Sequence, residues 1–299
     1  MHLLTEDDYR KFVSKKRRVT IENIEVEIGH AWRIGSFGPP KEYQPEEFTV
    51  WSFPNRGAWA THTGNYRGNW SPYIPRNLIT KYTTPGQTVL DQMVGSGTTL
   101  VECKLLGRNA IGVDINPDAV MVARDRLNFD YNPLDENIRS EIRTYVGDAR
   151  NLNLVEDESV DLVATHPPYA GIIKYGAKKI PDDLSRLKLP EYIDAMRHVA
   201  CESFRVLKPD HYCAVLIGDT RKGRHYIPIS IGVLQAFLAA GFILKEDIIK
   251  LQHKMMSTRE KWRGHKYDFY KIAHEHLYVF RKPAKGEKTS PLKFSKKWW

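Results

Sequence analysis

The chain has 299 residues, of which 41% are hydrophobic and 27% are charged, and its formal net charge is +9. These values fit a globular protein with a full core and exclude a disordered or disulfide-stapled chain. No apolar run is long enough to span a bilayer and the N-terminus does not resemble a signal peptide, so we expect a cytoplasmic protein with no membrane partner. The basic excess favours a polyanionic partner, with nucleic acid first and an anionic membrane surface second.

The first 50 residues form a charged N-terminal extension. They contain the basic run KKRR (15–18) and the alternating stretch TIENIEVEIGHAW (20–32), which predicts a short strand or hairpin. The run either contacts phosphate or forms a solvated surface. We expect the main domain to cover 51–284 and a basic tail to cover 285–299.

From about residue 86, short apolar strands alternate with amphipathic helices. This alternation predicts an α/β fold, a doubly wound and mainly parallel sheet that ends in an antiparallel hairpin. Ligands of such sheets bind at the carboxyl ends of the strands. The predicted strands are 88–91, 109–114, 142–148, 160–165, 212–219, 242–251 and 273–282, and the predicted helices are 98–106, 117–129, 190–207 and 227–241.

The three cysteines are scattered and form no C-x-x-C pair. Cys103, Cys201 and Cys213 therefore predict neither a disulfide framework nor a zinc site, and we expect no metal. Free cysteine is among the most buried residue types, so we interpret each as part of the core.

Three acidic residues end three successive predicted strands around the Gly-rich turn GSGTT (95–99). Asp91 ends the first strand, Asp114 is placed to accept the hydroxyls of a ribose, and Asp148 to accept from an adenine amino group. Two glycines let a ligand approach the backbone, and the next helix offers N–H donors to a carboxylate. Taken singly, each acid is more simply a helix cap or turn former. Together they predict a nucleoside-containing cofactor.

At this point the sequence resembles a known family. VLDQMVGSGTTLVECKLLGRNAIGVDIN (89–116) resembles the S-adenosylmethionine motif of amino-group DNA methyltransferases, which modify N4 of cytosine or N6 of adenine. THPPY (165–169) resembles their catalytic [D/N/S]-P-P-[Y/F] motif. The segment 51–79 resembles the part that packs beside the methionine end of the cofactor. The resemblance covers about residues 50–282 and departs from the family at Gln92-Met93, where Pro-Phe is usual.

The resemblance implies a Rossmann-like class I methyltransferase fold and S-adenosyl-L-methionine as cofactor. The residues it implies for cofactor binding are His62, Tyr66, Asp91, Gly95, Ser96, Gly97, Thr98, Thr99, Asp114, Ile115, Asp148, Ala149 and Thr165.

The catalytic residues implied by the resemblance are His166, Pro167, Pro168 and Tyr169. An exocyclic amine is a poor nucleophile, so it must be held in line with the methyl group by hydrogen-bond acceptors, while the Tyr ring stacks a flipped-out base. The family usually has Asp, Asn or Ser in place of His166. Only neutral imidazole accepts a hydrogen bond, so we predict that activity falls as the pH drops through a histidine pKa of about 6.5. Alternatively, His166 fills space while Thr165 or backbone carbonyls accept.

A non-acidic residue at this motif position favours cytosine N4 over adenine N6. The loops 175–188, 220–226 and 254–271 are left to contact the substrate, and they fit recognition of shape rather than readout of a groove. We therefore favour structured RNA, such as ribosomal RNA, with DNA as the alternative. The alternative interpretation is that these loops form only solvated surface. The candidate nucleic-acid-binding residues are Lys174, Arg221, Arg224, Arg259, Lys261, Trp262, Arg263 and Lys266.

Two hypotheses that assign the protein a different kind of function stay open. One is a catalytically silent nucleic-acid-binding subunit. The other is a methyltransferase for a small molecule or a protein glutamine, since Pro-Pro-Tyr motifs also position amide nitrogens. The sequence leaves the target nucleotide, the number of methyl groups and the oligomeric state undetermined.

Overall fold

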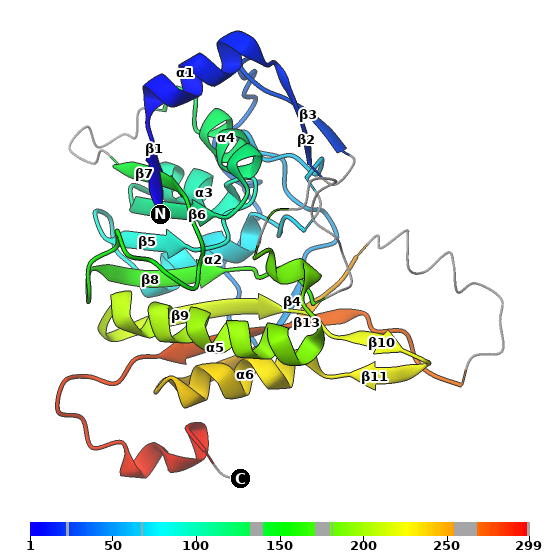
Figure 1. Cartoon of the computed structure of the whole chain (residues 1–299), viewed down its shortest axis with the longest axis vertical. Coiled ribbons are helices and arrows are strands. Elements are labelled where there is room, and N and C mark those ends of the chain that lie inside the picture. The colour runs from blue at the N-terminus through cyan, green and yellow to red at the C-terminus, as the bar shows by residue number, and fades with distance from the viewer. Residues whose placement is uncertain are drawn as a thin grey trace.

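A nine-stranded sheet forms the centre of the protein (Figure 1). The computed structural model describes residues 1–21, 24–66, 68–131, 140–170, 180, 182–253 and 268–297. The strands of the sheet are β1 (His2–Leu4), β4 (Val50–Ser52), β5 (Thr88–Asp91), β6 (Asn109–Asp114), β7 (Ile142–Val146), β8 (Val160–Thr165), β9 (Leu207–Ile217), β12 (Ile243–Leu251) and β13 (His274–Arg281). Their order in the sheet is β1-β7-β6-β5-β8-β9-β13-β12-β4.

Helices and two hairpins complete the described chain. The helices are α1 (Glu6–Lys15), α2 (Tyr73–Tyr82), α3 (Thr98–Leu106), α4 (Pro117–Arg126), α5 (Leu189–Val206) and α6 (Ile229–Ala239), with 3₁₀ turns η1 (Leu184–Arg186) and η2 (Ser290–Ser295). The hairpins pair β2 (Arg18–Ile21) with β3 (Ile24–Glu27), and β10 (Thr220–Lys222) with β11 (His225–Ile227).

The predicted α/β class is confirmed. Strands β7, β6, β5, β8 and β9 run parallel, and β13 pairs antiparallel with both β9 and β12. The helix predicted over 98–106 is present as α3, and it ends there because Gly107 adopts a left-handed C-cap with φ of 70°. Pro117 is the first residue of α4 and follows the N-cap Asn116. Proline fits this position because the first N–H of a helix has no partner within the helix.

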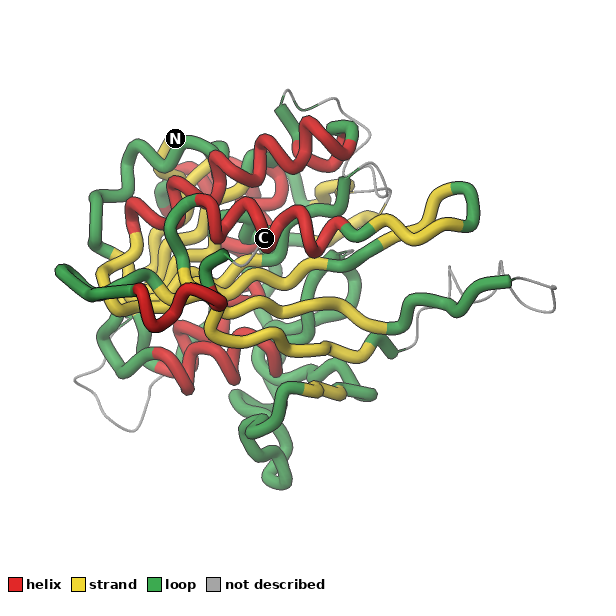
Figure 2. Tube along the Cα trace, turned by 90° about the horizontal axis from the view of Figure 1, so that it is seen from below, coloured by secondary structure: helices red, strands yellow, loops and turns green. Residues whose placement is uncertain are grey.

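Side chains of the central strands alternate between two cores. On β9, Cys213, Val215 and Ile217 pack with α5 and α6. The intervening Ala214 and Leu216 pack on the opposite face with residues of α2 and α3. Both faces of a parallel sheet are covered by helices in this arrangement, which explains the nearly unbroken apolar strands (Figure 2).

Several expectations need correction. The loop predicted over 220–226 contains the β10–β11 hairpin. Cys201 is exposed on α5, whereas Cys103 and Cys213 are buried as predicted. The predicted N-terminal extension contributes β1 to the main sheet, antiparallel to β7, and the predicted hairpin exists as β2–β3. Among the described residues, the helices are all too short or too polar to cross a bilayer.

Candidate active site

The predicted motifs meet at one edge of the sheet. Because β7, β6, β5, β8 and β9 are parallel neighbours, their carboxyl ends lie side by side. Asp148, Asp114, Asp91, His166 and Gly218 stand at or just after these ends, in that order across the sheet. This arrangement is the position at which doubly wound sheets bind their ligands.

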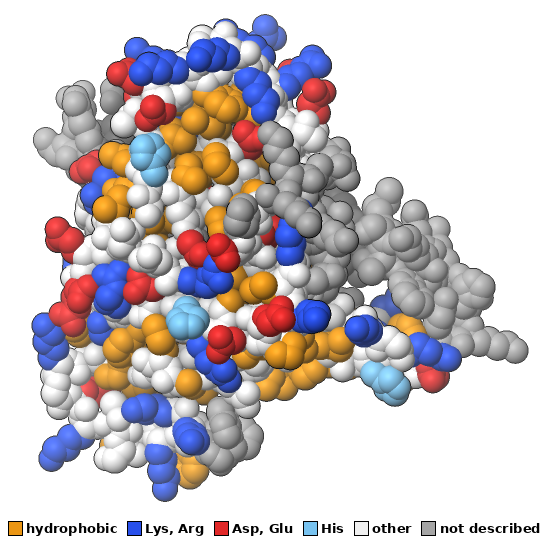
Figure 3. Space-filling model, in the orientation of Figure 1, with side chains coloured by type: hydrophobic (Ala, Val, Ile, Leu, Met, Phe, Trp, Pro, Cys, Tyr) orange, Lys and Arg blue, Asp and Glu red, His pale blue; other side chains and the backbone are white. Residues whose placement is uncertain are grey.

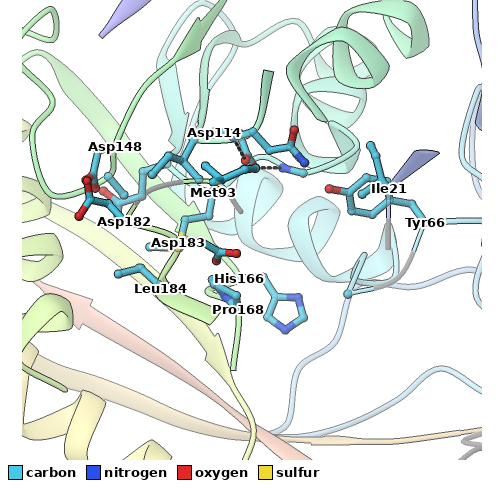
Figure 4. A pocket seen from close by; sticks show the side chains of 17 residues that line it. Ile21, Tyr66, Met93, Asp114, Asp148, His166, Pro168, Asp182, Asp183 and Leu184 are labelled. Atoms are coloured by element: carbon cyan, nitrogen blue, oxygen red, sulfur yellow. Dashed lines mark hydrogen bonds between the residues drawn. The ribbon is translucent and has the colours of Figure 1, made fainter. Parts of the chain in front are cut away.

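A cavity of about 100 Å³ opens at this edge. Figure 4 shows Asp114 and Asp148 on one side of it and His166 and Pro168 on the other. The lining residues are Ile21, Tyr66, Gly68, Gln92, Met93, Gly95, Asp114, Ile115, Asn116, Asp148, Ala149, His166, Pro168, Ile180, Asp182, Asp183 and Leu184.

Asp114 is held by the backbone of the Gly-rich turn. Its two carboxylate oxygens accept from the N–H groups of Gly95 and Asn116, each at 2.9 Å. Burial raises the pKa of Asp114 to about 6. A carboxylate has about four lone-pair positions, so two remain for a ligand with paired hydroxyls.

The glycines of this turn leave no room for side chains. Gly95 has φ of 49°, and a Cβ there would lie 3.3 Å from the ring of Tyr66; at Gly97, with φ of 82°, it would lie 3.0 Å from Ala123. Both the left-handed backbone and the close packing therefore require glycine.

Asp91 is fully enclosed below the turn. It accepts from the hydroxyl of Thr99 at 2.5 Å and from the N–H of Met93 at 3.2 Å. Burial raises the pKa of Asp91 to about 7. The next residue, Gln92, is one of the two positions at which the sequence departs from the family pattern. Its side-chain amide donates a hydrogen bond from Nε2 to the hydroxyl of Ser203 on α5, at 2.8 Å.

Two other predicted cofactor residues are engaged by arginines. Asp148 accepts from Arg150 at 2.6 Å and also lines the cavity. The hydroxyl of Ser96 accepts from Arg126 at 2.6 Å. Arg126 is itself 1% exposed, and burial lowers its pKa to about 10. No sequence pattern marks Arg126, because basic residues are common in the last turn of a helix.

His62 lies away from the cavity lining. Its Nε2 is 2.7 Å from Glu102 of α3, which also accepts from Trp59 and Arg76. Thr98 donates to Asn69, Thr165 is buried, and Ile115 and Ala149 line the cavity. The structure thus brings most of the predicted cofactor residues together and places His62 in a neighbouring polar cluster.

The residues of THPPY lie at the end of β8. His166 stacks on Trp70 with ring centroids 6.0 Å apart, and its Nε2 is 3.0 Å from the hydroxyl of Tyr169. The Tyr169 ring lies over Gly218, where a Cβ would be 3.1 Å away. The Tyr169 hydroxyl donates to Glu275 of β13.

The expected pH dependence of His166 needs correction. Burial lowers the pKa of His166 to about 4, and the charge of Glu275 only partly opposes this. The imidazole is therefore neutral throughout pH 5–8, and the predicted fall of activity near pH 6.5 does not follow from its titration.

Of the predicted nucleic-acid-binding residues, Lys174, Arg259, Lys261, Trp262, Arg263 and Lys266 lie outside the described part of the chain. Arg221 donates to the backbone carbonyls of Arg224 and Tyr270, and its guanidinium lies 4.7 Å from the Phe269 ring centroid. Arg224 pairs with Asp268 at 2.7 Å. The cavity residues Ile180, Asp182, Asp183 and Leu184 belong to the loop 175–188, which the sequence offered for substrate contact without naming single residues. Ile21 was not predicted, because nothing around it marks a ligand contact.

A parallel sheet with a Gly-rich turn and a carboxylate at the next strand end defines a Rossmann-like protein that binds a nucleoside cofactor. A family model described as DNA methylase matches residues 5–125 and 160–299. The chain therefore belongs to this amino-group methyltransferase family, whose cofactor is S-adenosyl-L-methionine. The lone pairs of Asp114 that remain after its two backbone hydrogen bonds, on a side chain that lines the cavity, fit the ribose hydroxyls of that cofactor.

Three curated proteins illustrate the similarity. A type II methyltransferase from Methanocaldococcus jannaschii is 36% identical over 21% of this chain and 12% of its own length. A tRNA (guanine(10)-N2)-dimethyltransferase from Methanothermobacter thermautotrophicus is 37% identical over 35% of this chain and 29% of its own. A release factor glutamine methyltransferase from Caulobacter vibrioides is 32% identical over 44% of this chain and 45% of its own. The chain thus spans less than half of each relative.

Proposed function

We propose that the protein is a methyltransferase that modifies an exocyclic amino group of a base in nucleic acid. We favour N4 of cytosine as the target atom and structured RNA as the substrate. The observation that carries the proposal is the position of His166 and Pro168 on the same cavity as Asp114. The residues suited to the cofactor and the motif suited to a target amine therefore line the same cavity.

The bound cofactor would supply an electrophilic methyl group. His166 would accept a hydrogen bond from the target amine, because its imidazole is neutral, and so would help localise a lone pair that the base ring otherwise delocalises. Pro167 and Pro168 have no N–H, so this segment presents carbonyls alone to the ligand. The Tyr169 ring would stack the base, which must leave its helical stack to enter.

The preference for cytosine depends on His166, because the adenine branch usually has Asp or Asn at this position. The preference for RNA is supported by the relative that acts on tRNA and by loops suited to shape recognition. DNA stays the alternative, because the matching family model is that of DNA methylases.

The proposal is tested with the full chain and labelled S-adenosylmethionine. The protein is incubated separately with total RNA, with genomic DNA and with a glutamine-containing release factor, and the products are digested and analysed by mass spectrometry. We expect N4-methylcytidine in RNA. Product in DNA, on adenine or on glutamine would replace the proposed substrate by the corresponding alternative. Cofactor binding without methyl transfer to any of them would identify a silent binding subunit.

The β10–β11 hairpin is a further candidate for substrate contact. It projects from the end of the sheet that carries the cavity (Figure 2), and Figure 3 shows Lys and Arg side chains at its tip. Lys222 and Arg224 are exposed there. The Arg224–Asp268 pair is also exposed, and such pairs are worth at most about 1 kcal/mol, so phosphate can replace Asp268.

We expect the double variant Lys222→Gln, Arg224→Gln to bind RNA more weakly and with a smaller dependence on salt. Each lost phosphate contact lowers the slope of log K against log salt by about 1, which gives about 2 for the pair. Fluorescence anisotropy at several salt concentrations measures both quantities. Lys245→Gln is the matched control, because it removes an exposed charge from the end of β12 that lies away from the hairpin. Equal slopes in the two variants would place the hairpin outside the interface.

A further inference from the structure

A chain of polar groups leads from the catalytic motif into the antiparallel part of the sheet. His166 Nε2 is 3.0 Å from the Tyr169 hydroxyl, which contacts Glu275 Oε1. The second oxygen of Glu275 accepts from Lys250 Nζ at 2.7 Å. Glu275 and Lys250 lie directly opposite each other on β13 and β12. Neither residue belongs to a motif of the sequence.

The sheet itself creates this chain. His276 pairs with Ile217, so Glu275 is level with Gly218 at the end of β9. Gly218 in turn leaves the space in which the Tyr169 ring lies. The Tyr169 hydroxyl is thereby held between a residue of its own motif and a carboxylate from a strand 106 positions away.

The direction of the hydrogen bonds follows from the charges. Glu275 is 6% exposed. Burial acts to raise the pKa of Glu275, but Lys250, His166 and the hydroxyl of Tyr169 together hold that pKa below its usual value. The ionised carboxylate can only accept, so the single hydrogen of the Tyr169 hydroxyl points to Glu275. The hydroxyl oxygen can then only accept from His166, which requires a hydrogen on Nε2.

We propose that Glu275 and Lys250 are positioning residues that fix the tautomer of His166 through the hydroxyl of Tyr169. In this tautomer Nδ1 carries the lone pair and is the ring nitrogen left to accept from a target amine. The catalytic use of that nitrogen rests on the proposed function, whereas the tautomer does not. The same contacts fix the orientation of the Tyr169 ring, since they hold its hydroxyl on one side and Gly218 supports its face.

The tautomer is tested by long-range ¹H–¹⁵N spectra of the histidine rings in the full chain at pH 7, with the His166 signals assigned from His166→Asn. We expect a neutral Nε2–H ring in the wild type and a mixed or Nδ1–H ring in Glu275→Gln. Tyr169→Phe interrupts the same chain and should give the same spectral change. A wild-type Nδ1–H ring, or a ring unchanged in Glu275→Gln, would overturn the assignment.

Lys250→Met tests the other end of the chain, and covers the case in which Glu275→Gln does not fold. Without the ammonium group, Glu275 takes up a proton more readily and can donate to Tyr169, so the spectrum of His166 should change in the same direction. Asp247→Asn is the matched control. It alters a carboxylate 3.0 Å from His276 Nδ1, three residues from Lys250 and thus on the opposite face of β12, so the His166 signals should not move.

Methyl transfer supplies the second readout. We expect Glu275→Gln to lower kcat about 10- to 100-fold, by analogy with the loss of the partner that orients a metal-bound histidine. Cofactor affinity should not change, and Asp247→Asn should retain wild-type kcat. A wild-type protein that methylates no substrate would refute the proposed function alone, because the spectra still decide the tautomer. Wild-type kcat in Glu275→Gln would refute the positioning role alone.

Discussion

His166→Ala is expected to reduce methyl transfer by about 100- to 1,000-fold at saturating cofactor. This is the typical loss when a group aimed at charge developing in a transition state is removed. The alanine variant has no acceptor where the imidazole stacks on Trp70, so the target amine keeps its lone pair delocalised. Single-turnover rates with radiolabelled cofactor measure the effect, and calorimetry separates it from a loss of cofactor affinity.

His166→Asn is the matched variant, because the asparagine amide also presents an acceptor and is a usual residue at this position of the family. We expect it to recover most of the lost rate. If alanine and asparagine are equally slow, the imidazole acts through its shape. If both retain wild-type rates, Thr165 or backbone carbonyls act as acceptors, which is the alternative left open by the sequence.

The pH profile gives an independent check on the same residue. Burial holds the pKa of His166 at about 4, with the charges of Lys250 and Arg56 adding to that effect and Glu275 opposing it. The imidazole accepts only when neutral, so its acceptor is available above about pH 5 and is lost as the pH falls through 4. At saturating cofactor we expect an acid limb near pH 4 in the wild type and no such limb in His166→Asn.

The fold could be predicted largely from the sequence because polar motifs interrupt apolar strands at sharp points. Asp91, Asp114 and THPPY each end an apolar run, and parallel pairing brings such ends together. The three-residue strand β1 carries too short a pattern to be recognised. Its place is decided by pairing with β7, a contact between residues 140 or more positions apart.

The candidate site was less predictable where function depends on a partner from a distant element. Glu275 occupies an ordinary alternating strand, and only the register of β13 on β9 brings it to Tyr169. The pKa of His166 depends on its burial, which no local pattern reveals. His62 was assigned to the cofactor from its segment, whereas the structure pairs it with Glu102 of α3.

Asp114→Asn is expected to weaken cofactor binding by about 10- to 100-fold at pH 7.5. The carboxylate already accepts from two backbone N–H groups of the Gly-rich turn, and its remaining lone pairs would accept the ribose hydroxyls. An amide has only one oxygen, so at least one of these donors loses its acceptor. Hydrogen bonds to charged groups contribute about 1.5–3 kcal/mol, and each 1.4 kcal/mol is tenfold in the dissociation constant.

The affinity of the wild type should also depend on pH, because burial raises the pKa of Asp114 to about 6. The ionised form binds the hydroxyls, so affinity falls as the pH drops through 6, and this step disappears in Asp114→Asn. A step from Asp91, whose pKa burial raises to about 7, would be common to both proteins. Asp118→Asn is the control, because Asp118 lies in the first turn of α4 and faces Lys16 at 3.6 Å. Isothermal titration between pH 5 and 8 measures all three, and an unchanged dissociation constant in Asp114→Asn would place the ribose elsewhere in the cavity.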